Sequence, residues 1–588
     1  MDLTAALREH FGFRDFRPGQ LEASRAALAD RDVLVVMPTG SGKSLCYQLP
    51  ALLRDDLTVV VSPLVALMQD QVEALRARGL DESVALVNSQ QDGAANADAV
   101  RRAVAGDLRL LYVAPERFAA MGFVERMRAA RIGLFVVDEA HCVSQWGHDF
   151  RPDYFRLADA ARVLGASALI ASTATATPGV AQDVARRLDL RDPVRVATGF
   201  DRPNIAFAVA RPAGHEKRGL IAAALRQPDA LPAIVYAGTR AGAEQLADEL
   251  SEELGVAAAA YHAGLERERR AEVQRAFLAD QVPLIVATNA FGMGVDKPNV
   301  RSVIHASVPA SLEAYYQEAG RAGRDGRPAR ALLTAENRDK ALHVHSIKSD
   351  EIEHGLPGWL ADRFAAAADG HGRYSLDAAE LARDLGGGRD RVRSLVGHLT
   401  RAGVLQPSPS LPDRVDGRLT GAFDKRAELR CRASIEEAAR ARWRQYREIW
   451  AYVERDSCRR EAVLRHFGDR SQPERRPGAC CDVCDQGLVP ALPAADPAAL
   501  EGLDEAIVSV ARTARPSVGR TTCAEILHGA RSQKIKRNSY DGLPAYGVSA
   551  RMRRADILAR VDELIDDGRI ETSGGPYPVL KCPSASPS

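Results

Sequence analysis

The 588-residue sequence lacks the features that direct a chain into a membrane or out of the cell. Residues 1–13 contain no apolar core of the kind a signal peptide needs, and no apolar run is long enough to span a bilayer. A strong net charge is also missing, because the formal value is only +1. This balance excludes a uniformly basic protein, so any surface that binds nucleic acid must be local. We expect a soluble cytoplasmic protein with no membrane partner.

Cysteine is sparse, and its distribution argues against a disulfide framework. Nine is an odd number, and four of the nine fall within a short stretch near residue 470. The stretch predicts a tetrahedral Zn²⁺ site formed by Cys458, Cys480, Cys481 and Cys484. Adjacent residues point in different directions, so His466 or Cys431 is an alternative to one member of the Cys480–Cys481 pair as the fourth ligand.

The most informative stretch is residues 35–50, V-V-M-P-T-G-S-G-K-S-L-C-Y-Q-L-P. Glycines at 40 and 42 let backbone N–H groups turn towards an anion just where a helix would begin. Lys43 can then reach the outer phosphates of a nucleotide, and Ser44 can bind Mg²⁺ through its hydroxyl. The strict phosphate-loop pattern has glycine where Met37 stands, and the alternative is a glycine-rich turn before a helix.

A second segment, F-G-F-R-D-F-R-P-G-Q at residues 11–20, precedes this loop. The amide of Gln20 offers a donor and an acceptor side by side, which suits the edge of an adenine. Phe13 can stack on the same base. The alternative is a capped loop whose aromatic residues belong to the core.

Apolar strand-like runs alternate with helical stretches after the phosphate loop, at 57–61, 108–113, 133–137 and 168–171. This alternation predicts a parallel sheet covered by helices, with ligands at the carboxyl ends of its strands. Asp138 directly follows the third of these runs and predicts a Mg²⁺ ligand. Glu139 can act as the general base that polarises the attacking water. Simple strand-end capping is the alternative.

A second α/β unit begins near Phe200, with strands expected at 233–236, 257–261, 283–287 and 302–305. It has no phosphate loop of its own. It carries Gln317, Arg321 and Arg324, and the two arginines share one helix face. Arginines presented across a cleft can stabilise the charge of phosphoryl transfer, whereas surface ion pairing is the alternative.

Residues 11–326 resemble the RecQ family of superfamily 2 (DEAH-box) DNA helicases, motif by motif. Besides the segments above, the resemblance rests on S-P-L-V-A-L-M-Q-D-Q, D-E-A-H-C-V-S-Q-W-G-H-D-F-R-P-D-Y, S-T-A-T-A, F-D-R-P-N-I, Y-H-A-G-L, A-T-N-A-F-G-M-G-V-D-K-P-N-V-R and Q-E-A-G-R-A-G-R-D-G. It implies an ATP-dependent helicase that unwinds duplex DNA in repair and recombination and moves 3′ to 5′ on single strands. C-R-R-E-A-V-L-R-H-F-G-D, residues 458–469, resembles the zinc module of the family, although Gly478 stands where a cysteine is usual.

The resemblance also implies roles for individual residues. ATP would contact Phe13, Arg17, Gln20, Thr39, Gly40, Ser41, Gly42, Lys43, Ser44 and Gln317. Hydrolysis would depend on Lys43, Asp138, Glu139, Arg321 and Arg324, with Mg²⁺ on Ser44 and Asp138. An aromatic-rich loop that couples DNA binding to hydrolysis would contain His141, Gln145, Trp146, His148, Phe150 and Arg151. Exposed Trp and Phe there offer stacking faces for unpaired bases.

We therefore expect two RecA-like parallel-sheet lobes followed by helical zinc-binding and winged-helix domains. The expected boundaries are lobe 1 at 1–200, lobe 2 at 201–345, a winged-helix-like insert at 350–430, a helical zinc module at 435–487, a linker at 488–500 and a second winged helix at 501–582. Arginines of the insert either approach a phosphate backbone or form a solvated face.

The last predicted domain carries the local basic surface. Nine Lys/Arg stand against three Asp/Glu between Arg520 and Arg560, which predicts contact with duplex phosphates. The hairpin tip at 574–577 either wedges between base pairs or packs the wing. Two other functions stay open: an RNA helicase of the wider superfamily, and a DNA-binding scaffold that uses nucleotide only as a switch.

Overall fold

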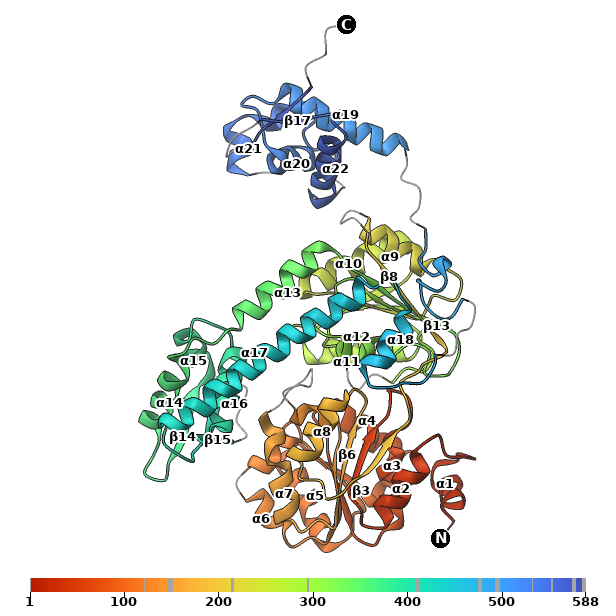
Figure 1. The fold of residues 1–588 in the computed structure, drawn as a ribbon, viewed down its shortest axis with the longest axis vertical. Helices are drawn as coiled ribbons and strands as arrows, with labels where there is room; N and C mark the ends of the chain where they lie inside the picture. The colour runs from red at the N-terminus through yellow and green to blue at the C-terminus, as the bar shows by residue number, and fades with distance from the viewer. Residues whose placement is uncertain are drawn as a thin grey trace.

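The computed structural model describes residues 2–120, 122–144, 152–212, 216–292, 296–408, 413–473, 478–491, 497–530, 532–550, 552, 554–573 and 578–583. Two parallel α/β sheets, a helical region with a cysteine cluster and a C-terminal helical domain follow one another (Figure 1), which confirms the predicted fold class. Within the described ranges, no helix is both long enough and apolar enough to cross a bilayer.

Lobe 1 is built on a seven-stranded parallel sheet. In spatial order its strands are β3 (Val84–Val87), β4 (Leu110–Val113), β2 (Leu57–Val61), β5 (Ile132–Val137), β6 (Ala168–Thr173), β1 (Val33–Val36) and β7 (Val194–Ala197). The inner strands are buried along their whole length and are largely apolar, because helices cover both faces of the sheet. The helices of this lobe are α1 (Leu3–Phe11), α2 (Gln20–Leu28), α3 (Leu45–Leu53), α4 (Val65–Arg76), α5 (Gly93–Ala105), α6 (Phe123–Met127), α7 (Leu157–Val163) and α8 (Pro178–Arg187).

The strand order of lobe 1 brings distant segments together. β6 pairs in parallel with both β1 and β5, so the carboxyl ends of these three strands lie at one edge of the sheet. The phosphate loop follows β1, and Asp138 follows β5. The topology therefore sets the acidic pair beside the phosphate loop.

Lobe 2 holds a six-stranded parallel sheet. Its strands, in spatial order, are β10 (Ala258–Tyr261), β11 (Leu284–Ala287), β9 (Ala233–Tyr236), β12 (Ser302–His305), β13 (Ala329–Thr334) and β8 (Ile205–Ala210). The helices of this lobe are α9 (Lys217–Leu225), α10 (Arg240–Leu254), α11 (Arg267–Leu278) and α12 (Leu312–Ala319).

The outer edge of β8 is covered by the cysteine-rich module. Phe207 N donates to the carbonyl of Cys480 at 3.0 Å, and Asp482 N donates to the carbonyl of Phe207 at 3.1 Å. An exposed strand edge would offer unpaired backbone groups to other chains. The module closes this edge and is thereby joined to the sheet.

Two helices form an arm between lobe 2 and the insert. α13 (Asn337–Ser349) and α17 (Lys425–Val453) contact each other and run together towards the insert (Figure 1). The long helix begins at Lys425, ahead of the boundary at 435 that we expected for the zinc module, because the Asp424 side chain caps it by accepting from Ala427 N at 2.8 Å. α18 (Arg459–His466) follows in the cysteine-rich module.

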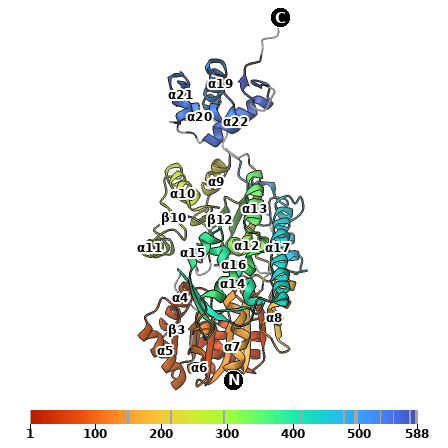
Figure 2. The same cartoon turned by 90° about the vertical axis from the view of Figure 1, so that its left-hand side faces the viewer.

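The insert itself is a small domain beside lobe 1 (Figure 2), where β15 contacts the short helix η2 (Pro115–Ala119). Its elements are α14 (Leu356–Ala367), β14 (Arg373–Asp377), α15 (Ala378–Asp384), α16 (Arg389–Arg401), β15 (Leu405–Ser408) and β16 (Arg414–Leu419). The antiparallel sheet has the order β14-β16-β15. Two helices, α15 and α16, followed by the hairpin of β15 and β16 have the succession of a winged helix, and α14 and β14 precede them.

The C-terminal domain has its own apolar core and lies beyond lobe 2, at the end of the molecule away from lobe 1 (Figures 1 and 2). It consists of α19 (Pro497–Thr513), α20 (Arg520–His528), α21 (Gln533–Arg537), α22 (Arg554–Asp566) and the short hairpin β17 (Glu571–Thr572) and β18 (Leu580–Lys581). The expected hairpin tip at 574–577 lies outside the described residues.

Candidate nucleotide site and metal centre

A cavity of about 490 Å³ lies between the two lobes. Lobe 1 lines it with Phe13, Arg17, Gln20, Thr39, Gly40, Gly42, Lys43, Ser44, Asp138 and Glu139, and lobe 2 lines it with Gln317, Arg321 and Arg324. The structure therefore brings together every residue that we predicted for ATP binding and hydrolysis except Ser41. That side chain turns back into its own loop, where its Oγ donates to the carbonyl of Pro38 at 2.7 Å.

The glycines of the phosphate loop are required by both conformation and space. Gly40 and Gly42 have φ of +80° and +81°, a region that L side chains rarely adopt. A Cβ on Gly42 would lie 2.6 Å from Gln20 Nε2, and a Cβ on Gly40 would lie 3.3 Å from Arg324 Cγ. The loop is therefore in close contact with α2 on one side and with lobe 2 on the other.

Gln20 braces this loop. Its Nε2 donates to the carbonyls of Ser41 and Gly42, both at 3.0 Å, and its Oε1 accepts from Arg17 N at 2.8 Å. Reading the edge of an adenine would require Gln20 to exchange part of this network. Phe13, with half of its surface exposed at the cavity, is in the position that stacking on a base requires.

Partly buried charges of both signs line the lobe 1 side of the cavity. Burial lowers the pKa of Lys43, whereas burial and the neighbouring charge of Glu139 raise the pKa of Asp138 to about 7. Glu139 has φ of +47°, an uncommon backbone conformation for a non-glycine residue. The two carboxylates and the hydroxyl of Ser44 line the same cavity, and such oxygens are the hard donors that Mg²⁺ prefers.

The arginines of lobe 2 lie in the turn after α12, so the prediction that they share a helix face was wrong: the helix ends at Ala319 and the chain turns from Gly320 onwards. Arg321 is almost fully buried, and burial together with the charge of Arg321 lowers the pKa of Arg324. Arg324 Nη1 lies 2.5 Å from Asp296 Oδ1, a partner that we did not predict. Asp296 belongs to a motif quoted above, but only the fold shows that it faces the cavity.

His141 joins the acidic pair to the end of β6. Its buried ring places Nδ1 at 3.0 Å from Thr173 Oγ1 and at 3.3 Å from a Glu139 carboxylate oxygen. Ser144, the last described residue before the expected coupling loop, donates its hydroxyl to Asp183 at 2.7 Å. The other residues predicted for this loop, Gln145, Trp146, His148, Phe150 and Arg151, lie outside the described residues.

The four predicted cysteine ligands meet in one cluster. Their sulfur atoms all lie within 4.8 Å of one another, and Cys458 Sγ is 3.8 Å from Cys480 Sγ and 3.9 Å from Cys481 Sγ. Four sulfurs at about 2.3 Å from a tetrahedral Zn²⁺ stand about 3.8 Å apart, so the spacing fits that ion. Both adjacent cysteines therefore face the same point.

The two alternative ligands are used elsewhere. His466 Nε2 lies 2.9 Å from Glu313 Oε1 on α12, and His466 does not belong to the cysteine cluster. Cys431 is buried in the core of the insert. The cluster is therefore a four-cysteine zinc site, and His466 instead connects the cysteine-rich module to lobe 2.

The basic surface of the C-terminal domain is smaller than the sequence suggests. Arg520 pairs with Asp562, Arg554 with Glu525, and Arg560 with Asp504. Two of these acids lie outside the segment in which the charges were counted. Lys536 and Arg537, exposed on α21, keep a local positive surface.

The arginines of α16 in the insert are also largely engaged. Arg391 donates to the carbonyls of Leu385 and Glu351, Arg393 pairs with Asp390, and Arg401 donates to the hydroxyl of Ser434. These contacts hold the helix in its own domain and reduce the surface that could face a phosphate backbone.

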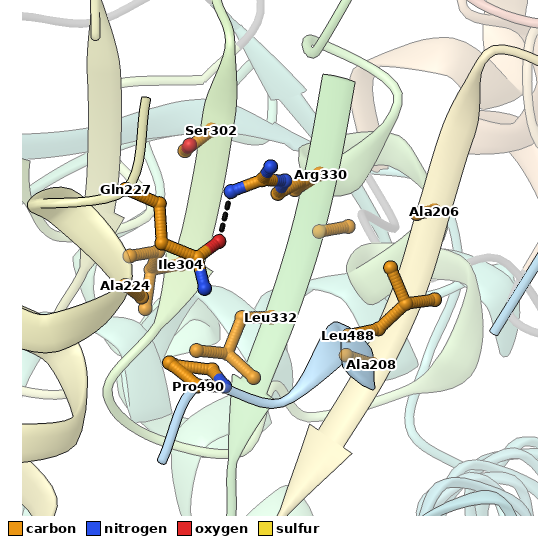
Figure 3. Close-up of a pocket in the computed structure, with 11 residues that line it drawn as sticks. Ala206, Ala208, Ala224, Gln227, Ser302, Ile304, Arg330, Leu332, Leu488 and Pro490 are labelled. Atoms are coloured by element: carbon orange, nitrogen blue, oxygen red, sulfur yellow. Dashed lines mark hydrogen bonds between the residues drawn. The ribbon is translucent and has the colours of Figure 1, made fainter. Parts of the chain in front are cut away.

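A second cavity in lobe 2 is too small to be a ligand site. It has about 20 Å³, close to the space that a single water molecule needs. Figure 3 shows it between β8, β12 and β13, with Gln227 hydrogen-bonded to Arg330 at one end and Leu488 and Pro490 covering the other. The segment that follows the cysteine cluster thus packs against the sheet of lobe 2.

Four family models match the chain. They are DEAD/DEAH box helicase at residues 17–184, helicase conserved C-terminal domain at 217–326, RecQ zinc-binding at 424–485 and RQC domain at 501–587. The first two cover the lobes that form the cavity, and the third contains the cysteine cluster.

Several bacterial proteins are similar to the chain over most of its length. The ATP-dependent DNA helicase RecQ of Pasteurella multocida (strain Pm70) is 33% identical over 95% of this chain and 73% of its own length. The ATP-dependent DNA helicase RecQ of Bacillus subtilis (strain 168) is 31% identical over 98% and 81%, respectively. The probable ATP-dependent DNA helicase RecS of the same strain is 34% identical over 82% and 92%.

Proposed function

Because this chain belongs to the RecQ family of ATP-dependent DNA helicases, we propose that it couples ATP hydrolysis to 3′ to 5′ movement along single-stranded DNA and unwinds duplexes in repair and recombination. The observation that carries the proposal is the cavity between the lobes. It sets a lysine and two carboxylates on one wall opposite two arginines on the other. Such a site can bind a nucleoside triphosphate and stabilise the negative charge on the transferred phosphoryl group during hydrolysis.

Each residue of the cavity has its own role in ATP binding or hydrolysis. Lys43 and the backbone of the phosphate loop hold the phosphates, and Glu139 takes the proton of the attacking water. Arg321 and Arg324 stabilise the charge on the transferred phosphoryl group from the opposite lobe. Gln20, Phe13 and Gln317 orient the rest of the nucleotide at the rim of the cavity.

Ser44 and Asp138 are the residues that fit Mg²⁺. The pKa of Asp138 is raised by burial and by the negative charge of Glu139, and a bound cation would relieve both effects. When bound, Mg²⁺ supplies positive charge to the phosphate oxygens. Asp138 and Ser44 hold oxygen atoms ready for it at the end of β5 and the start of α3.

DNA is the proposed partner at two places. The loop that contains Trp146 and Phe150 would receive unpaired bases and pass the effect of binding to Glu139 through His141, which contacts it at 3.3 Å. The exposed cations of α21 would meet duplex phosphates. We propose that the protein acts in the cytoplasm, in association with DNA.

A partial duplex with a single-stranded tail tests the proposal. With ATP and Mg²⁺, we expect unwinding when the tail is 3′ and none when the tail is 5′. Single-stranded DNA should stimulate ATP turnover more than RNA of the same sequence. DNA-stimulated turnover without unwinding of either substrate would instead indicate a translocase, and stimulation by RNA alone would indicate an RNA helicase.

A further inference from the structure

Arg202 bridges the two walls of the nucleotide cavity without belonging to either predicted set of site residues. It lies between Phe200 and β8, where the chain enters lobe 2. Its Nη1 donates to the carbonyls of Thr39 at 3.1 Å and Gly320 at 3.1 Å, and its Nη2 donates to those of Ala322 at 2.9 Å and Gly323 at 3.2 Å. One acceptor is in the phosphate loop, and three are in the turn that carries Arg321 and Arg324.

This arrangement fixes the distance between groups that must act together. The side chain is one planar fork, so its four bonds hold the two backbone segments in a single register. The fit is close, because a Cβ on Gly320 would lie 2.5 Å from Thr39 Oγ1. Any change in the position of Arg202 would therefore shift the arginine-bearing turn against the phosphate loop.

The charge of Arg202 also bears on the cavity. Among the described residues, the hydrogen-bond partners of its guanidinium are carbonyl groups rather than carboxylates. Burial lowers the pKa of Arg202, and the nearby charge of Arg324 lowers it further. A guanidinium stays protonated even so, and its positive charge next to two other arginines favours an anion in the cavity.

A buried arginine, Arg460, holds Arg202 in place. Arg460, which is 1% exposed, donates to the carbonyl of Arg202 at 3.2 Å and to that of Ile205 at 2.6 Å, and it lies 3.1 Å from Asp201. It also donates to the carbonyl of Ala479. Arg460 follows the ligand Cys458 by two positions, and Ala479 directly precedes the ligand Cys480. The zinc module thus supports the backbone that presents Arg202.

We propose that Arg202 is a positioning residue for ATP hydrolysis, which registers the arginine-bearing turn of lobe 2 against the phosphate loop of lobe 1. The inference rests on the proposed ATPase function and adds a residue to it. Arg202 acts through the backbone of both walls and not by touching the nucleotide. Its loss should reduce the rate of the chemical step more than the affinity for ATP, because the phosphate-binding groups of lobe 1 remain in place.

The full chain with zinc bound can test this by steady-state ATP hydrolysis with a saturating single-stranded oligonucleotide. We expect Arg202→Ala to lower kcat by about 10²-fold, the cost of misplacing a catalytic group by about 1 Å. The KM for ATP and the binding of a fluorescent ATP analogue should change far less. Arg202→Lys keeps the positive charge and should recover part of the rate. The recovery should be incomplete, since an ammonium group cannot span four carbonyls in a fixed plane.

Arg301 provides the matched control. It is a buried arginine of lobe 2, and it bonds the carbonyls of Asn299 and Pro328 and the carboxylate of Asp325, all inside its own lobe. Arg301→Ala should lower the melting temperature and leave kcat near the wild-type value. Equal losses of kcat in Arg301→Ala and Arg202→Ala would overturn the proposal, because a general loss of packing would then explain both.

The outcomes separate this inference from the function on which it rests. A wild-type chain that does not turn over ATP would contradict the proposed function. A wild-type chain that does, together with an Arg202→Ala variant of equal kcat, would contradict only the role of Arg202. If Arg202→Ala does not fold, Arg202→Lys decides the matter: reduced kcat at an unchanged melting temperature supports the proposal, and wild-type kcat overturns it.

Discussion

The two lobes have the same architecture, but they bring different chemistry to the cavity between them. Lobe 1 contributes a glycine loop, a partly buried lysine and a carboxylate pair, all at the ends of neighbouring strands. Lobe 2 contributes arginines from the turn after one helix, and among its described residues no glycine loop of this kind lines the cavity. Neither sheet is a complete site, so the lobes must come together before the reaction can proceed. We therefore expect lobe 1 to bind the nucleotide and lobe 2 to stabilise the charge of phosphoryl transfer.

The largest effect is expected in lobe 1. Lys43→Ala should reduce ATP turnover to background, because the ammonium group that binds the phosphates is lost. Phosphate release with and without single-stranded DNA measures this. Arg31→Ala, which removes an exposed ion pair with Asp192 in the same lobe, is the control. Normal turnover by Lys43→Ala would refute the assignment of the phosphate loop.

The corresponding change in lobe 2 removes one of its arginines. Arg321→Ala should lower kcat by about 10³-fold or more, the usual cost of losing an arginine that stabilises phosphoryl transfer. Binding of a fluorescent ATP analogue should persist. Arg269→Ala, an exposed arginine on α11, should turn over like the wild type. Loss of nucleotide binding in Arg321→Ala would break the division between a binding lobe and a charge-stabilising lobe.

Loss of the cysteine cluster should destabilise lobe 2 more than lobe 1, because the backbone of the cluster pairs with the outer edge of β8. Metal analysis of the wild-type chain should find one zinc ion per molecule. Cys481→Ser should lose the ion and lower the melting temperature, since metal binding and folding are coupled. Cys431→Ser is the matched control, because this cysteine is buried away from the cluster. Full zinc content in Cys481→Ser would show that fewer cysteines suffice.

The smallest effect is expected for the pair of Glu313 on α12 and His466 on α18. Although burial opposes ionisation, the hydrogen bond and charge of His466 lower the pKa of Glu313 to about 2. Burial also opposes the charged imidazole, but Glu313 raises the pKa of His466. Glu313 therefore stabilises the fold above its unfolded pKa of about 4.5 and loses this effect as pH falls towards 2. His466 stabilises the fold below about pH 6.5 and loses the effect as pH rises through its higher folded pKa.

The pair should consequently contribute most between about pH 4.5 and 6.5. The difference in melting temperature between the wild type and Glu313→Gln should peak in that window and narrow on both sides. Glu268→Gln, an exposed carboxylate on α11, should show no such peak. A difference that does not vary with pH would mean that the pair acts through packing alone.

Much of the fold could be predicted because its inner strands are continuous apolar runs. The strands at 57–61, 233–236 and 302–305 have the expected ends, and the phosphate loop and the acidic pair lie where strand–helix alternation places them. β3 and β7 were not predicted, since four-residue strands at the edges of a sheet leave a short signal in the sequence. β8 and β13 were missed as well, because alanine-rich strands resemble helices in composition.

Other features depend on contacts between distant residues. Gln20 was predicted to read adenine, yet its amide holds the phosphate loop, which is visible only when residues 20 and 42 are seen side by side. The charge count near the C-terminus omitted Asp504 and Asp562, whose positions next to arginines are set by helix packing. Arg202 lies in a quoted motif, but a motif does not reveal that four carbonyls surround a side chain.

The arm formed by α13 and α17 would convert a small rotation of lobe 2 into a larger displacement at its far end. A helix of 29 residues is about 43 Å long, and its contact with α13 stiffens it. A rotation of lobe 2 by about 5° would carry the far end of such a rod by about 4 Å, close to the width of one side chain. The insert at that end rests on η2 of lobe 1. A fluorescent label on the insert would therefore show the largest displacement if the lobes close.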